Sequence, residues 1–236
     1  MKAGVPAAAA FPRGQIVARG HGNAGPILCT GRVSFNDRTV SSASPSAAVR
    51  NAAPEPLQVT RPIVLVGLMG AGKTCIGRLL ARKLGLDFVD SDEEVVKASA
   101  CSIADIFRLY GEAAFREGER KVMRRLLGGG AVVIASGGGA FMDPDTRALI
   151  RASATSVWLR ASLDILLART VGRPGRPLLD GRDPRDVLEW LMAERYPTYA
   201  EANVIVDTTN DVKDAVAERI VRALAAAGKG NSGLVL

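Results

Sequence analysis

The segment Gly67–Thr74 narrows most sharply what this chain can fold into. Its sequence, GLMGAGKT, fits the pattern GxxxxGK[ST] and stands between an apolar run at 63–66 and a segment of helical spacing from Ile76 to Leu84. In that position the glycines let the backbone wrap a phosphate, and amides of the loop and of the next helix point at it. The pattern therefore predicts a strand, a phosphate loop and a helix, in that order.

Several residues of this loop have expected roles in nucleotide binding. Lys73 adds positive charge beside the phosphates, and the Thr74 hydroxyl is suited to ligate Mg²⁺. The nucleotide-binding set is therefore Gly70, Ala71, Gly72, Lys73, Thr74 and Cys75. The alternative is a glycine-rich turn that binds no nucleotide. Even with nucleotide, the motif alone leaves switches, motors, small-molecule kinases and regulators open.

Short β-rich runs alternate with helical patterns from Arg61 onward. Five runs are strand candidates: 63–66, 87–89, 131–134, 156–159 and 203–206. Alternation of this kind predicts an α/β fold, with a parallel sheet covered by helices on both faces. Capping sequences predict helix starts at Ser102, Asp143 and Asp183, and a last helix is expected over about 212–227.

The ends of the chain differ from this patterned region. Residues 1–60 are rich in Ala, Gly, Ser, Pro and Arg without a sustained period, which predicts a disordered extension before a folded domain at 61–228 and a flexible tail at 229–236. An organelle transit peptide has a similar composition. A bacterial extension, or a start codon assigned too early, would look the same.

Bulk composition disfavours several classes of function. Of the net charge of +7, residues 1–61 supply +5, from seven basic and two acidic residues, so the patterned remainder predicts no nucleic-acid partner. The longest uncharged stretch, 126–142, contains six glycines and predicts no membrane span. The three cysteines lack metal-type spacing, and the one histidine, His21, lies far from the motifs. Any acid–base chemistry must then use carboxylates, lysine or arginine. The cysteine pattern fits a protein of a reducing compartment.

Two carboxylates follow the second strand candidate. Asp90 and Asp92 are spaced i, i+2, so in extended geometry both side chains would lie on one face at the carboxyl edge of the sheet. One could place magnesium while the other accepts the proton of an attacking hydroxyl. The alternative is a helix cap with an acidic first turn, continued by Glu93 and Glu94.

Two identical glycine triplets flank the third strand candidate. Gly137, Gly138 and Gly139 follow its carboxyl end, on the sheet edge expected to carry the phosphate loop, where side chains would occupy the space of an acceptor. The triplet at 128–130 enters the strand at the opposite edge, where a helix stop and a turn explain it. Strand polarity therefore predicts substrate binding for the first and a connecting role for the second.

Arginines outside the extension offer anion-binding groups. Arg116 and Arg195 could grip a carboxylate with two parallel hydrogen bonds, although most surface arginines do no such thing. The segment 172–183 is polar, rich in Gly and Pro, and carries Arg173 and Arg176. It predicts a mobile lid that closes an arginine over the phosphates.

The blocks GLMGAGKT, VDSD, SIADIF, GEAAFRE, SGGGA, GRPGRPLL and ERYPTYAEA, in this order from about Ile63 to Asp207, closely resemble the shikimate kinase family. The resemblance implies a P-loop, nucleoside-monophosphate-kinase-like fold with a five-stranded parallel sheet of order 2-3-1-4-5. It implies phosphorylation of the 3-hydroxyl of shikimate by ATP and Mg²⁺, on the pathway to chorismate. We expect a monomer that binds these small molecules, in the cytoplasm, or in a plastid if residues 1–60 are a transit peptide.

The same resemblance assigns roles to individual residues. Asp92 would act as the base, with Lys73 and Arg176 as its catalytic partners, and Asp90 and Thr74 would hold magnesium. Arg169, just before the lid, would lie against adenine. The acceptor site would comprise Asp92, Arg116, Gly137, Gly138, Gly139 and Arg195, with Phe107, Phe115 and Glu119 completing its wall. The residues themselves favour an anionic polyol as acceptor, and the resemblance names it.

Two other functions stay open on the sequence alone. The principal rival is another small-molecule kinase of this fold, such as a gluconate kinase, which would share the phosphate loop but lack the acceptor set. A non-catalytic sensor or regulator is the second, although Lys73, Asp92 and Arg176 are all present and residues 1–60 lack a helix-turn-helix pattern.

Overall fold

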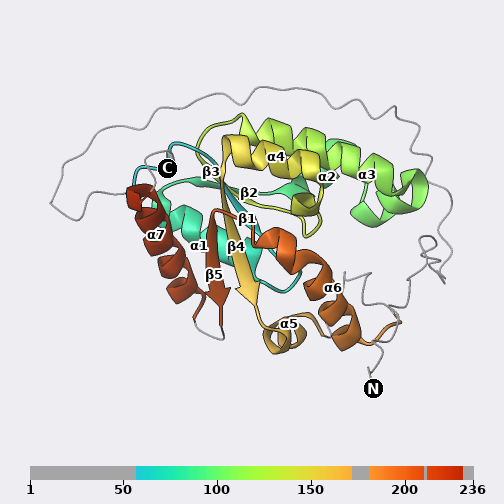
Figure 1. Ribbon diagram of the computed structural model, residues 1–236. Coiled ribbons are helices and arrows are strands. Elements are labelled where there is room, and N and C mark those ends of the chain that lie inside the picture. The colour runs from blue at the N-terminus through green and yellow to red at the C-terminus, as the bar shows by residue number, and fades with distance from the viewer. Residues whose placement is uncertain (1–56, 172–180, 210–211, 231–236) are drawn as a thin grey trace, which may run out of the picture. The chain divides into compact units, whose positions relative to one another are not determined.

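The computed structural model describes residues 57–171, 181–209 and 212–230 (Figure 1). In chain order the elements are β1 (Ile63–Val66), α1 (Lys73–Leu84), β2 (Asp87–Asp90), α2 (Ser91–Ser99), α3 (Ile103–Leu127), β3 (Val132–Ala135), the 3₁₀ turn η1 (Ala140–Met142), α4 (Pro144–Ser153), β4 (Thr155–Ala161), α5 (Leu163–Thr170), α6 (Pro184–Tyr199), β5 (Val204–Thr208) and α7 (Lys213–Gly230). The predicted alternation of strands and helices is confirmed.

The five strands form one parallel sheet of order β2-β3-β1-β4-β5. All four residues of β1 are buried, as expected for a central strand covered on both faces. Figure 1 shows α1 and α7 together on one side of the sheet and α4 and α6 on the other. Because β1 lies between β3 and β4, the carboxyl ends of β1 and β3 meet where the strand order reverses, the usual ligand edge of such sheets.

Local sequence explains where most helices begin and end. The predicted N-caps accept hydrogen bonds from the first turn: Ser102 from the Asp105 N–H, Asp143 from the Thr146 N–H and Asp183 from the Arg185 N–H. Gly85 ends α1 in the left-handed conformation. The helix starts predicted at these three residues are therefore confirmed.

Helix α3 contains one break, at Gly111. This residue has φ 79° and ψ 174°, a conformation open to glycine and costly for residues with a Cβ. Helix α3 packs with α2 on both sides of the break, since Val95 of α2 shares a buried cluster with Ile106 before it and with Phe115 and Val122 after it.

Strand ends differ from the predicted ranges by a few residues. β3 lies one position later than expected, and β4 extends to Ala161 because its last residues pair with β5, Arg160 with Asp207 and Ala161 with Thr208. A single sequence cannot reveal this pairing partner, so the apolar run alone underestimates the strand.

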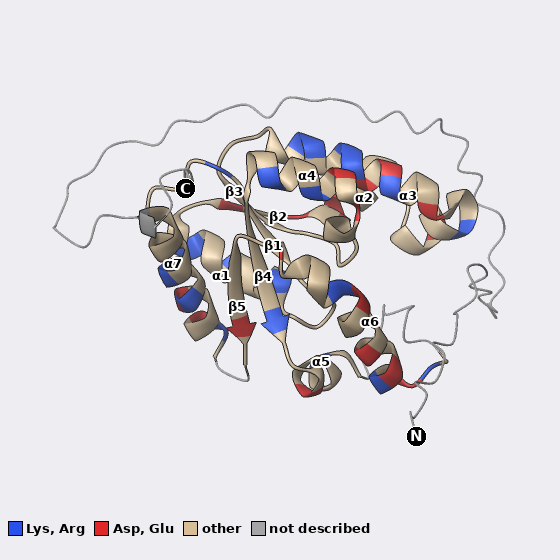
Figure 2. Cartoon of the chain, in the orientation of Figure 1, with Lys and Arg blue, Asp and Glu red and all other residues tan. Residues whose placement is uncertain are grey.

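Charged residues of the helices are interspersed by sign rather than gathered by sign (Figure 2). Glu94 of α2, for example, forms ion pairs with both Lys97 of the same helix and Arg125 of α3, each at 2.7 Å. Among the described residues, no helix is both long and apolar enough to cross a bilayer.

Some predictions lie outside the described residues. These are the extension through residue 56, the lid as far as residue 180 with Arg173 and Arg176, and the tail from residue 231.

Candidate active site

The loop between β1 and α1 has the backbone shape that phosphate binding requires. Gly70 and Gly72 have φ values of 80° and 95°, which lie in the left-handed region. The Lys73 ammonium folds back over the loop and donates to the carbonyls of Gly67 at 2.8 Å and Leu68 at 3.1 Å. Helix α1 begins at Lys73, so its N-terminal amides open into the same loop.

The second strand joins this loop through a hydrogen bond between side chains. The Thr74 hydroxyl donates to Asp90 Oδ2 at 2.8 Å, and the Asp92 N–H donates to Asp90 Oδ1 at 3.1 Å. Asp90 is thus the N-cap of α2. A hydroxyl and a carboxylate side by side at the phosphate loop are ligands that Mg²⁺ prefers.

The expected extended geometry of Asp90 and Asp92 is wrong. Asp90 ends β2, but Asp92 lies in the first turn of α2, whose acidic residues Asp92, Glu93 and Glu94 suit the positive end of a helix. The helix-cap interpretation of this segment therefore holds for Asp90. It does not remove Asp92 from the site, because the turn of α2 carries the Asp92 side chain to the glycine triplet.

Each glycine of the triplet 137–139 faces a different group of the site. A Cβ atom on Gly137 would lie 2.6 Å from Asp92 Oδ1 and 2.9 Å from Glu119 Oε1. On Gly139 it would lie 2.6 Å and 2.7 Å from the two Nη atoms of Arg116, and on Gly138 its closest neighbour would be Arg195 Nη1, at 3.6 Å. Gly137 and Gly139 are thus required for space rather than for a positive φ.

The triplet also lies against the phosphate loop. Ser136 donates to the Leu65 carbonyl of β1 through both its N–H, at 3.1 Å, and its hydroxyl, at 2.9 Å. These bonds tie the end of β3 to the strand that leads into the phosphate loop, and the Cβ position of Gly138 is 3.8 Å from the Gly67 carbonyl oxygen. The two glycine-rich loops are therefore neighbours at one sheet edge.

Two arginines reach the triplet from different helices. Arg116 of α3 is held by Glu119 at 2.7 Å and by Glu112 at 3.3 Å, and its guanidinium lies 5.2 Å from the centre of the Phe115 ring. Arg195 of α6 donates from Nη1 to the Gly138 carbonyl at 3.1 Å. Since they meet adjacent glycines, the two guanidinium groups border the same space.

Glu119 is a buried carboxyl in this cluster, with 2% of its surface exposed. Burial raises the pKa of Glu119 above its ordinary value, and the Arg116 guanidinium opposes that rise, while the neighbouring Asp92 adds to it. Its Oε2 accepts from Arg116, whereas Oε1 has no hydrogen-bond partner among the described residues. An oxygen left in this state, beside Asp92 and Gly137, fits a site that receives a polar ligand.

The remaining predicted site residues lie on both sides of this cluster. The rings of Phe107 and Phe115 lie on either side of the break in α3, with centres 4.7 Å apart and planes tilted by 32°. Arg169, at the end of α5, donates to the Thr209 carbonyl at 2.6 Å, and its Nη1 is 3.9 Å from the Cβ position of Gly72. Arg169 therefore lies between the phosphate loop and the end of β5, on the side away from Asp92.

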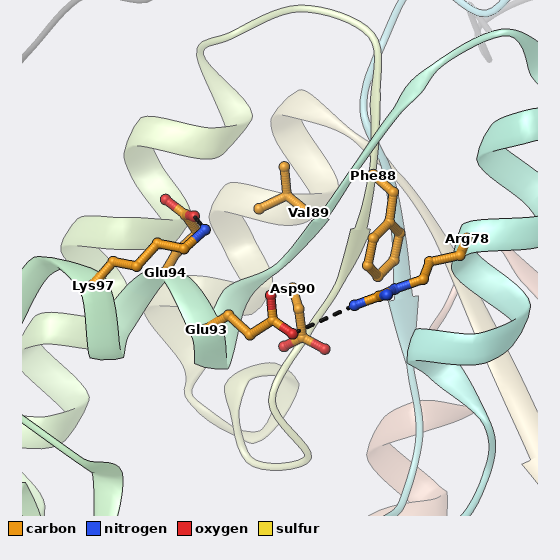
Figure 3. Close-up of a pocket in the computed structure, with 7 residues that line it drawn as sticks. All are labelled: Arg78, Phe88, Val89, Asp90, Glu93, Glu94 and Lys97. Carbon is orange, nitrogen blue, oxygen red and sulfur yellow. Dashed lines mark hydrogen bonds and ion pairs between the residues drawn. The ribbon is translucent and has the colours of Figure 1, made fainter.

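A separate cavity of about 370 Å³ lies along the outer side of β2 (Figure 3). It shares Asp90 with the site, but not Lys73, Thr74 or Asp92. Its other carboxylates are paired, Glu93 with Arg78 at 3.5 Å and Glu94 with Lys97 at 2.7 Å. The cavity therefore adds no group to the cluster around the triplet.

Two residues that hold the triplet in place are not predicted from the sequence. The buried Ser91 hydroxyl accepts the Gly137 N–H at 3.0 Å, and the Tyr199 hydroxyl donates to the Gly138 carbonyl at 2.5 Å. The first bond commits the Gly137 N–H to Ser91. A signal for Tyr199 was present, because it follows Arg195 by one helical turn and shares its face of α6.

Comparison with known proteins bears directly on this arrangement. A family model described as shikimate kinase matches residues 69–225, which include Lys73, Asp92, Arg116, the triplet 137–139 and Arg195. The chain belongs to the shikimate kinase family. The family implies use of ATP, and the fold predicted from the resemblance is confirmed.

Relatives support this membership in sequence and structure. The shikimate kinase of Paramagnetospirillum magneticum is 60% identical over 167 residues, covering 71% of this chain and 86% of that protein. That of Mesorhizobium japonicum is 49% identical over 165 residues, covering 70% and 81%. The solved structure of shikimate kinase from Acinetobacter baumannii in complex with shikimate matches with a TM-score of 0.68 and 35% identity, over 72% of this chain and 96% of that one.

Proposed function

We propose that this chain transfers the γ-phosphoryl group of MgATP to the 3-hydroxyl of shikimate, giving shikimate 3-phosphate for chorismate synthesis. The observation that carries the proposal is the convergence of Asp92, Arg116 and Arg195 on one glycine triplet beside the phosphate loop. One carboxylate and two guanidinium groups around a backbone without side chains suit an acceptor that is both an anion and a polyol. A gluconate kinase need not share this set.

The donor side consists of the phosphate loop and Arg169. The loop amides and the N-terminus of α1 would hold the phosphates, with the Lys73 ammonium exchanging its contacts with Gly67 and Leu68 for phosphate oxygens. Arg169 would lie against adenine, near Thr209. Arg176 would complete this side from the lid, which lies outside the described residues.

Magnesium fits the pair formed by Thr74 and Asp90. The described residues include no cluster of three or more His, Cys, Asp or Glu side chains that could hold a metal by themselves. A hydroxyl and a carboxylate joined at 2.8 Å instead suit an ion that keeps several waters and binds phosphate oxygens. When bound, Mg²⁺ would neutralise charge on the β- and γ-phosphates.

On the acceptor side, the different neighbours of the three glycines would set the orientation of the bound substrate. Arg116 and Arg195, at Gly139 and Gly138, would grip the carboxylate, while Asp92, at Gly137, would receive the reacting hydroxyl. The Gly138 and Gly139 N–H groups are the donors we assign to ring hydroxyls, since that of Gly137 is already given to Ser91. Phe107, Phe115 and Glu119 would form the wall behind the ring.

Asp92 would act as the base. As the 3-hydroxyl oxygen attacks the γ-phosphorus, its proton passes to the Asp92 carboxylate and its electron pair forms the new P–O bond. The bond from the γ-phosphorus to the bridging oxygen breaks, and ADP leaves with that electron pair. Lys73 would stabilise charge that develops on the phosphoryl oxygens.

We also propose the bounds of the kinase domain, its oligomeric state and its cellular compartment. All described site residues lie within 61–228, and we propose that this segment is a self-contained kinase domain that acts as a monomer. We place it in the cytoplasm, where ATP is available, and the plastid alternative depends on residues 1–60, which lie almost entirely outside the described part.

A coupled ADP-release assay with shikimate, quinate and gluconate offered separately tests the proposal. We expect saturable turnover with shikimate and little with the other two acids, because gluconate has no ring and quinate has a saturated ring with an additional hydroxyl on the carbon that bears the carboxylate. Turnover only with gluconate, or with none of the three, would contradict the proposed function.

A further inference from the structure

Tyr199 is a fully buried residue at the end of α6, with 0% of its surface exposed. Its ring packs with three other aromatic rings, those of Phe141, Trp158 and Tyr196, at centre distances of 6.4, 6.0 and 6.4 Å. Its hydroxyl donates to the Gly138 carbonyl, which also accepts from Arg195 Nη1. The ring is therefore fixed by packing, and its one polar atom is fixed on the acceptor loop.

The glycine triplet has no side chains that could fix its backbone, so other residues must hold it in place. Space for Asp92 and Arg116 demands glycine at positions 137 and 139, and glycine has the widest backbone freedom of any residue. A loop of three glycines would lose much entropy on ordering around a ligand unless the protein ordered it beforehand. Ser91 holds the peptide between Ser136 and Gly137, and Tyr199 with Arg195 holds the peptide between Gly138 and Gly139.

Because a peptide group is planar, the hydrogen bonds to the Gly138 carbonyl also set the direction of the Gly139 N–H. The Gly138 carbonyl and the Gly139 N–H belong to one planar trans peptide, so they point in opposite directions. With the carbonyl directed at Tyr199 and Arg195, the Gly139 N–H points away from α6. This is the N–H that the proposed function assigns to a ring hydroxyl of the acceptor.

We infer that Tyr199 is a positioning residue for the acceptor: its hydroxyl fixes the peptide between Gly138 and Gly139 and thereby aims the Gly139 N–H at the substrate. The inference rests on the proposed function. Burial raises the pKa of Tyr199 to about 12, and the Arg195 guanidinium opposes this shift, so the hydroxyl keeps its proton and stays a donor at every pH at which the enzyme would work.

The test compares Tyr199→Phe with Tyr196→Phe in the full chain. Tyr196 lies on the same helix, and its hydroxyl also donates to a backbone carbonyl, that of Ala161 at 2.5 Å, away from the triplet. Each substitution removes one such hydroxyl and keeps the ring. Tyr199→Phe should lower kcat/KM for shikimate about tenfold, or about 1.4 kcal/mol, mainly through KM, with the KM for ATP within about twofold.

Tyr196→Phe should leave the KM for shikimate within about twofold of the wild type. Equal effects of the two substitutions on this KM, or an unchanged KM in Tyr199→Phe, would overturn the inference while leaving the proposed function intact. Failure of the wild type to phosphorylate shikimate would instead overturn the proposed function. The two failures are therefore distinguishable.

A second measurement keeps the inference testable if Tyr199→Phe does not fold. The chain has three tyrosines, Tyr110, Tyr196 and Tyr199, which can all be replaced biosynthetically by 3-fluorotyrosine without removing a hydroxyl. The fluorine resonance of Tyr199, assigned by difference from Tyr196→Phe and Tyr110→Phe, should shift when shikimate binds in the absence of nucleotide. A resonance that does not respond to shikimate would overturn the inference.

Discussion

The donor and acceptor sides of this site are built in different ways. Most of the donor side is one continuous loop and the start of the helix after it, from Gly67 to Thr74, joined by Arg169 of α5. The acceptor side instead draws Asp92 from α2, Arg116 from α3 and Arg195 from α6, around a glycine triplet that contributes space and backbone rather than side chains. The donor side is thus mostly encoded locally, while the acceptor side exists only once the sheet has formed.

This difference makes separate predictions for the two sides. Changes on the acceptor side should affect catalysis or shikimate binding according to which glycine their group faces, and should leave ATP binding largely intact. The Asp92 end of the triplet should control the chemical step, while the arginine end should control binding. The following variants test this division, in order of decreasing expected effect.

The largest effect is expected for Asp92→Asn. Loss of a positioned base should lower kcat by about 100-fold or more, while shikimate still binds because both arginines remain. Glu93→Gln is the matched control, since Glu93 lies next to Asp92 in α2 but faces Arg78 at the protein surface. Steady-state kinetics measure both variants. A near-normal kcat in Asp92→Asn would remove this residue from the role of base.

Gly139→Ala should act at the other end of the triplet. The new methyl group would lie 2.6 Å from the Arg116 guanidinium, and the end of that long side chain can move aside without unfolding the protein. We expect the KM for shikimate to rise about tenfold, because one carboxylate contact is displaced, with a smaller change in kcat.

Gly129→Ala, in the other triplet, is the control for this substitution. A Cβ atom there would meet only the Leu126 carbonyl oxygen, at an ordinary 3.5 Å, so the KM should not change. Equal effects of the two alanine variants would contradict the division of roles that strand polarity predicts for the two triplets.

The sequence predicted the backbone of the donor loop better than the backbone of the acceptor side. The helix that follows the phosphate-loop motif and the caps at Ser102, Asp143 and Asp183 are local patterns, and the structure confirms them. The backbone at Asp92 was predicted wrongly because Asp90 accepts the Asp92 N–H, so that α2 begins at once after β2. The spacing of Tyr199 from Arg195 could have placed both on one face of α6, but the contact with Gly138 joins residues far apart in the chain, and no local pattern indicates it.

The smallest effect is expected for Glu119→Gln and depends on pH. Because burial raises the pKa of Glu119 above its ordinary value of 4.5, the folded state holds this proton more tightly than the unfolded state. The stability that this gives is present below pH 4.5 and is lost as pH rises through the raised pKa. Glutamine cannot titrate and lacks this dependence.

Chemical denaturation at several pH values measures this difference. The free energy of unfolding of the wild type, relative to Glu119→Gln, should fall as pH rises above 4.5. A difference that is constant with pH, or that grows with it, would show that the Arg116 guanidinium outweighs burial in setting the pKa of this carboxyl.

The most direct test of the separation between the two sides is calorimetric titration of shikimate without nucleotide, into the wild type, Arg195→Ala and Lys73→Met. The account predicts that the wild type binds, that Arg195→Ala binds at least about tenfold more weakly, and that Lys73→Met binds within about threefold of the wild type. Equal weakening by the two substitutions, or unchanged binding in Arg195→Ala, would contradict an acceptor site built separately from the phosphate loop.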